Sequence, residues 1–106
     1  MRNGLYGELV KLARSGKTAS YTEIGGLVGL HPRSSRLHAL LSGVCTEEVG
    51  RGRPMLGAVV VGKSKGVPGG GFFHIAERLG RFRGGDKAAE KEFFSRELKA
   101  VYDAWQ

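Results

Sequence analysis

The pattern of hydrophobic and polar positions is first clear over residues 21–28. In a helix, the apolar side chains of this stretch would lie on one face. Ser20 precedes this stretch and Glu23 stands three residues later, which is the sequence pattern of a capping box. Gly29 then interrupts the stretch, as glycine often does just past a helix end. The pattern predicts a short helix whose inward side chains are Ile24, Leu27 and Val28.

A second apolar stripe, at the spacing i, i+3, i+4 and i+7, predicts a helix over residues 33–44. The stripe consists of Leu37, Leu40, Leu41 and Val44. Pro32 stands at the expected start of this helix, where a missing backbone N–H costs nothing. The opposite face carries hydrogen-bonding side chains, none of them acidic, namely Arg33, Ser34, Ser35, Arg36, His38 and Ser42. This pairing favours a helix-turn-helix with its second helix against DNA, although an ordinary helical hairpin with a solvated face has the same pattern.

The flanking segments extend this pattern to the rest of the chain. A first helix is predicted over residues 5–13, a Val-rich strand over 55–61 and a last helix over 87–104. The shorter predicted segments are a loop at 46–52, a mobile Gly-rich loop at 62–71, a return strand at 72–73, a helix at 74–79 and a linker at 81–85.

This order of elements is that of a winged helix. We therefore expect an α+β, mostly helical fold in which residues 1–106 form a single domain. Its winged helix-turn-helix core, with a short β-wing, would cover residues 5–79, and an added C-terminal helix would cover residues 87–105. The predicted core consists of Leu9, Leu12, Ile24, Leu27, Leu37, Leu40, Leu41, Val60, Phe73, Phe94, Leu98 and Val101.

The composition shows that this chain also carries a basic region suited to an acidic partner. The net charge is +7, and residues 49–76 contain no acidic residue. The basic residues of that window are Arg51, Arg53, Lys63 and Lys65. A one-sided basic region attracts polyanions and is typical of nucleic-acid binding. No apolar run is long enough for a membrane span and no signal peptide is evident. The single cysteine, Cys45, favours a reducing cytoplasm.

Two motifs suggest chemistry that their context does not favour. Residues 57–64 match the phosphate-loop pattern GxxxxGKS, but the four inner positions prefer a strand and no helix is predicted directly after Lys63. His31, His38 and Cys45 recur every seven residues, a spacing of about 10 Å on a helix that no single ion could bridge. We expect neither a cofactor nor a metal. The glycine run before Phe72 would either serve turn geometry or cradle an anion.

The chain resembles a known family over residues 18–73. The segments 21–25 (YTEIG) and 35–41 (SRLHALL), then Pro54, the strand 59–61 (VVV) and a Gly-rich loop, stand in the order found in the winged-helix DNA-binding domain of the alkylguanine-DNA alkyltransferases and alkyltransferase-like proteins. The resemblance implies that Tyr21 and Arg36 handle a flipped nucleotide and the gap it leaves.

The active-site motif of that family is missing. Where the family carries Pro-Cys-His-Arg or Pro-Trp-His-Arg, residues 54–57 read PMLG, so alkyl transfer is not expected. The chain also resembles a set of small uncharacterised prokaryotic proteins that share YTEI, GRP at 52–54 and PGGGFF at 68–73. That second resemblance covers most of the chain and implies no function.

The sequence thus predicts a non-enzymatic protein that binds double-stranded DNA through a recognition helix at 33–44 and a basic wing at 62–71. The predicted contact residues are Tyr21, Arg33, Ser34, Ser35, Arg36, His38, Ser42, Arg51, Arg53, Lys63 and Lys65. One alternative is a protein-interaction module, such as an adaptor, subunit or inhibitor, that binds through the wing or an exposed part of the apolar stripe at 94–105. A further alternative is an enzyme whose catalytic groups converge only in space.

Overall fold

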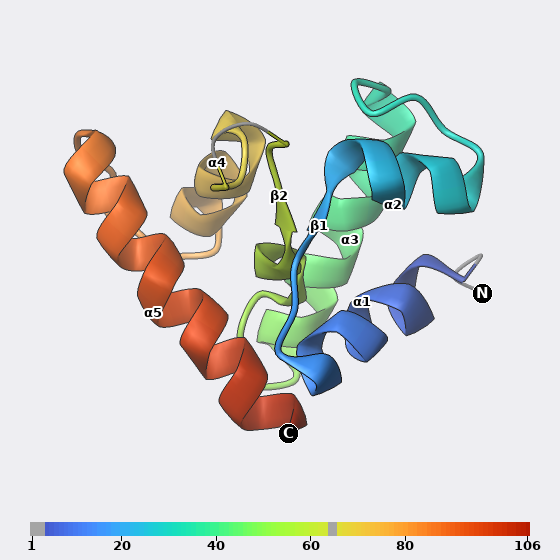
Figure 1. Cartoon of the computed structure of the whole chain (residues 1–106). Coiled ribbons are helices and arrows are strands. Elements are labelled where there is room, and N and C mark those ends of the chain that lie inside the picture. Colours follow the sequence, from blue (N-terminus) through green and yellow to red (C-terminus); the bar gives the residue numbers. More distant parts are fainter. Residues whose placement is uncertain (1–3, 64–65) are drawn as a thin grey trace.

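Figure 1 shows the computed structural model of the chain, which describes residues 4–63 and 66–106. The fold is α+β and mostly helical, and its described part contains one small parallel sheet. The elements in chain order are α1 (Leu5–Ser15), β1 (Ala19–Ser20), α2 (Tyr21–Val28), α3 (Ser35–Gly50), the 3-10 helix η1 (Leu56–Val59), β2 (Val60–Val61), α4 (Gly70–Arg78) and α5 (Lys87–Trp105). The central element is η1, which contacts α1, α3 and α5.

The predicted helices at 5–13, 21–28, 74–79 and 87–104 are confirmed, with differences at their ends. The capping box of α2 is present in full. The Glu23 N–H donates to Ser20 Oγ at 3.1 Å, and the Ser20 N–H donates to Glu23 Oε1 at 3.0 Å. These bonds satisfy two backbone donors that a helix start would otherwise leave unpaired.

The predicted loop at 46–52 was wrong for residues 46–50, because α3 continues to Gly50 and only residues 51–52 form a turn. Its buried face runs on through Val44 and Cys45 to Glu48, at helical spacing. The sequence hides this continuation because Glu48 is charged and yet faces inward. The helix also starts later than expected, since Ser34 is its N-cap and Pro32 lies in the preceding turn.

The strand predicted over 55–61 forms only at its end, where β2 pairs in parallel with β1 in the register Ala19↔Val60 and Ser20↔Val61. Residues 56–59 instead form η1 and are buried on every side. Since β1 has only two residues, a longer strand would lack a pairing partner for its buried backbone groups. The return strand predicted at 72–73 was also wrong, because both residues belong to α4.

One hydrophobic cluster joins the elements, and it includes most of the predicted core. The buried members of the prediction are Leu9, Ile24, Leu37, Leu41, Val60, Phe73, Phe94 and Val101, while Leu12, Leu40 and Leu98 are partly buried against them. Leu27 was wrong, since it is 62% exposed. The inward face of α2 is centred on Gly25, where a Cβ would lie 2.4 Å from the Leu30 carbonyl oxygen. That face leaves Leu27 on the outer side of the helix.

Two buried carboxylates fasten the centre of the molecule. Glu97 of α5 accepts the Met55 N–H at 2.8 Å and both the Nε and Nη2 of Arg81, at 2.7 and 2.8 Å. Glu48 of α3 accepts Nε and Nη2 of Arg53 at 2.8 and 3.0 Å, and the Tyr6 hydroxyl at 3.2 Å. Through Arg53 and Met55, these bonds attach the segment that leads into η1 to α3 and α5. Within residues 4–63 and 66–106, no helix is long and apolar enough to cross a membrane.

Candidate nucleic-acid interface

The turn before α3 and the first helical turns of α3 expose four of the eleven predicted contact residues to solvent. Arg33, Ser35, Arg36 and His38 are exposed. The turn is fixed by its own hydrogen bonds, since the Arg33 N–H donates to His31 Nδ1 and the Arg36 N–H donates to Ser34 Oγ, both at 3.1 Å. The basic and hydroxyl side chains of this segment therefore project from an ordered support.

Two of the predicted serines form hydrogen bonds within the protein. Ser34 is half-buried, and its hydroxyl caps α3. Ser42 lies two helical turns further along and accepts a hydrogen bond from Nη2 of Arg78 at 3.0 Å. Sequence reasoning missed Arg78. It is exposed near the end of α4, and its bond to Ser42 brings a further guanidinium to the side of α3.

Tyr21 connects the start of α2 to α3 and to the segment before α4. Its ring stacks on the His38 ring with centroids 5.7 Å apart and planes at 29°. Its hydroxyl accepts the Gly69 N–H at 3.0 Å. Burial raises the pKa of Tyr21, and the nearby Cys45 adds to this, although the hydrogen bond from Gly69 lowers it. The structure thus brings together Tyr21 and His38, which the sequence separates by a helix and a turn.

The segment at 62–71 differs from a β-wing in its described part. The Gly62 N–H donates to the Val67 carbonyl at 2.7 Å, Pro68 is buried, and Gly70 already begins α4. Lys63 is exposed directly after β2. Ser64 and Lys65 lie outside the described residues, and so does that part of the predicted mobile loop. The next helix within the described residues is α4, which begins at Gly70, whereas a phosphate loop leads straight into a helix after its lysine.

Arg51 and Arg53 lie at the other end of α3. The helix has 16 residues, so its C-terminal end is about 22 Å from its start at 1.5 Å per residue. Arg51 Nη2 is 3.9 Å from a Glu47 carboxylate oxygen. Arg53 donates hydrogen bonds to Glu48 through Nε and Nη2. Its guanidinium carbon lies 5.2 Å from the centroid of the Trp105 ring. These two arginines are therefore separate from the cluster around Arg36.

Cys45 is buried and lines a small cavity of about 20 Å³ together with Tyr21 and His38. The side chain is 1% exposed and lies beside Gly57, where a Cβ would be 2.7 Å from Sγ. Burial raises the pKa of Cys45 to about 12, against a lowering hydrogen bond at Gly57, and the charges of Glu97 and Glu48 add to the rise. Among the described residues, no group of three or more His, Cys, Asp or Glu side chains is placed to hold a metal ion.

Comparisons with protein-family models, with curated proteins and with solved structures found no match to this chain. The function is therefore inferred from the geometry of the site itself.

Proposed function

We propose that this protein binds double-stranded DNA without catalysing a reaction on it, through a helix-turn-helix formed by α2 and α3 in the manner of a winged helix. One observation carries the proposal: Arg33 in the turn before α3, and Arg36 and His38 in its first turns, are exposed, with no acidic residue in the first turn of the helix. In helix-turn-helix proteins the N-terminal residues of the second helix are the ones that reach base edges. The segment at 62–71, with Lys63, would take the place of the wing.

These side chains would make two kinds of contact with a duplex, one to base edges and one to backbone phosphates. A guanidinium such as that of Arg36 presents paired donors to the O6 and N7 atoms of guanine. Lys63, exposed at the end of β2, would serve as a point charge for backbone phosphates, which position the protein and carry no sequence information.

Two features favour this proposal over the alternatives. The stripe on α5 that could serve a protein partner is used by the domain itself, because Phe94 and Val101 are buried and Leu98, Tyr102 and Trp105 pack against the core. Met55 and Leu56 are fully buried at the positions where the alkyltransferases carry their reactive cysteine and histidine. Neither of these residues can support alkyl transfer.

The test is binding of a fluorescent duplex, followed by anisotropy at about 50 and 200 mM salt. We expect binding that weakens steeply with salt, because cations on the protein displace condensed counterions from the phosphates. Arg36→Ala should cost about 1–3 kcal/mol of binding free energy on a preferred sequence. Arg51→Ala, which removes the same charge from the other end of α3, is the matched control and should change little.

Two results would overturn the proposal. One is the absence of binding at low salt even near the ~10⁻⁴ M range of non-specific interactions, after which a protein partner becomes the better hypothesis. The other is an equal loss for Arg36→Ala and Arg51→Ala, which would mean that total charge, and not the start of α3, determines binding.

A further inference from the structure

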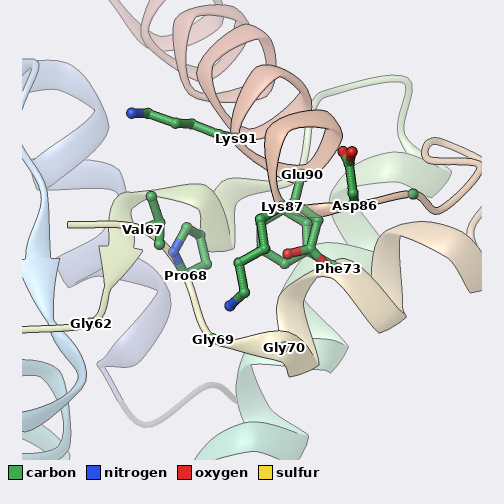
Figure 2. Close-up of a pocket in the computed structure, with 11 residues that line it drawn as sticks. Gly62, Val67, Pro68, Gly69, Gly70, Phe73, Asp86, Lys87, Glu90 and Lys91 are labelled. Carbon is green, nitrogen blue, oxygen red and sulfur yellow. The ribbon is translucent and has the colours of Figure 1, made fainter. Parts of the chain in front are cut away.

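A pocket of about 910 Å³ lies between the segment before α4 and the start of α5 (Figure 2). One wall is formed by Gly62, Val67, Pro68, Gly69 and Gly70, and the other by the first two turns of α5. The first turns of α3, α4 and α5 all lie at the same end of the molecule, the upper end in Figure 1. The pocket is therefore lined by segments at the end of the protein that carries the candidate interface.

The pocket wall is continuous with the surface of α3. Gly69, which lines the pocket, donates its N–H to the Tyr21 hydroxyl at 3.0 Å, and Tyr21 stacks on His38. A Cβ at Gly71 would lie 3.8 Å from His38 Nδ1. Among the described elements, none lies between His38 and Gly71 at the start of α4. A ligand that covers His38 and extends across these glycines reaches the pocket.

The far wall of the pocket supplies two cations. Lys87 and Lys91 are one helical turn apart on α5, both are exposed, and neither forms an ion pair within residues 4–63 and 66–106. The two acidic residues beside them are placed differently. Asp86 accepts the Ala89 N–H at 2.9 Å as the N-cap of α5, and Glu90 is half-buried. Figure 2 shows both lysine side chains extending away from the Asp86 carboxylate.

We propose that the DNA footprint extends across this pocket onto α5, where Lys87 and Lys91 bind phosphates of the backbone beside the groove that α3 enters. This inference rests on the proposed function. The lysines complement the negative charge of a phosphate backbone, and the glycines of the near wall allow a backbone to approach closely. The longest dimension of the protein is 33 Å, which is comparable to the length of one turn of duplex, about 34 Å.

The experiment measures how the binding constant for a duplex depends on salt, for the wild-type chain and three variants. Each phosphate contact contributes about 0.9 to the slope of log K against log salt. Lys87→Ala with Lys91→Ala should therefore flatten the slope by about 1.8, and Lys87→Glu with Lys91→Glu should weaken binding further. The matched control is Lys11→Ala with Lys99→Ala, which removes two exposed lysines paired with Glu8 and Asp103. The control should leave the slope as it is in the wild type.

The outcomes separate this inference from the function on which it rests. If the wild type binds no duplex, the proposed function fails. If the wild type binds and depends on Arg36, but the α5 double variants keep the wild-type slope, only the extension onto α5 is overturned. Full competition by a 5′-mononucleotide that depends on Lys87 and Lys91 would overturn it as well, because the pocket would then be a site for small ligands. Thermal unfolding of each variant confirms that it is folded.

Discussion

The ring of Tyr21 stacks on the ring of His38, with centroids 5.7 Å apart. Tyr21 begins α2 and His38 lies in the exposed first turns of α3, so the contact helps to fix the orientation of α2 relative to α3. The same tyrosine binds the Gly69 N–H through its hydroxyl. One side chain thereby links α2, α3 and the start of α4, the three parts of the proposed DNA surface.

Tyr21→Phe keeps the stack on His38 and removes only the hydrogen bond to Gly69. We expect the free energy of unfolding to fall by about 0.5–1.5 kcal/mol, the usual net value of one hydrogen bond, as measured by urea denaturation. Tyr102→Phe is the control, since its half-buried hydroxyl forms no hydrogen bond among those found in the described residues. Equal losses in the two variants would show that the bond to Gly69 contributes nothing to stability.

Removing the carboxylate of Glu97 should strongly destabilise the fold. The Met55 N–H would lose its acceptor in the core, and Arg81 would lose both of its hydrogen bonds. We expect Glu97→Ala to lower the free energy of unfolding by about 3–5 kcal/mol. Lys99→Ala on the same helix breaks the exposed pair with Asp103 and should cost less than about 1 kcal/mol. A similar small loss for Glu97→Ala would contradict a structural role for this carboxylate.

Glu48 should make stability depend on pH in the acid range. Burial raises the pKa of Glu48, but the hydrogen bonds and charge of Arg53, the Tyr6 hydroxyl and the charge of Arg51 together hold it below the ordinary value of 4.5. The unfolded chain therefore takes up this proton at a higher pH than the folded protein does. The stabilisation is present above pH 4.5 and is lost as the pH falls through the lowered pKa of the folded state.

The measurement is chemical denaturation of the wild type and of Glu48→Gln between neutral and acid pH. The variant should be less stable at neutral pH and should lose less stability on acidification, so the two curves converge. Parallel curves over the whole range would show that the pKa of Glu48 is the same in the folded and unfolded chains.

Gly57 and Cys45 should be energetically coupled. A Cβ at Gly57 would lie 2.7 Å from Cys45 Sγ, so Gly57→Ala should cost about 1–3 kcal/mol through overpacking. Cys45→Ala removes the sulfur that the new methyl group meets. In a double-mutant cycle, the Gly57→Ala change should therefore cost less in the Cys45→Ala background, with a coupling energy of about 0.5–3 kcal/mol. Additive losses would indicate that the backbone of η1 moves away and the two side chains never meet.

Leu41 and Leu27 should respond very differently to truncation, although both belong to the predicted core. Leu41 is 6% exposed and Leu27 is 62% exposed. Leu41→Ala should lower the free energy of unfolding by about 2–5 kcal/mol, whereas Leu27→Ala should stay within about 0.5 kcal/mol. Chemical denaturation of the two variants checks this, and a loss below about 1 kcal/mol for Leu41→Ala would mean that α3 is rotated relative to the core.

The sequence by itself determined the features that depend on residues close together in the chain. The capping box of Ser20 and Glu23 marked the start of α2, and the spacing of Leu37 and Leu41 identified the inward face of α3. The polar side of that helix, with Arg36 and His38, followed from the same period of 3.6 residues. Such local patterns act through the backbone within one or two turns, so they can be recognised in the sequence before the fold is known.

The tertiary structure alone decided what depends on partners far away in the chain. Residues 56–59 became a 3-10 helix because β1 is too short to pair with them, and α3 ran on to Gly50 because Glu48 meets Arg53 and Tyr6 inside the protein. Leu27 was turned outward by the close packing of Gly25. The contacts that join Tyr21 to His38 and Gly69, and that place Lys87 across the pocket, link segments up to 48 residues apart. No periodicity encodes such contacts, because they arise only when the chain has closed around its core.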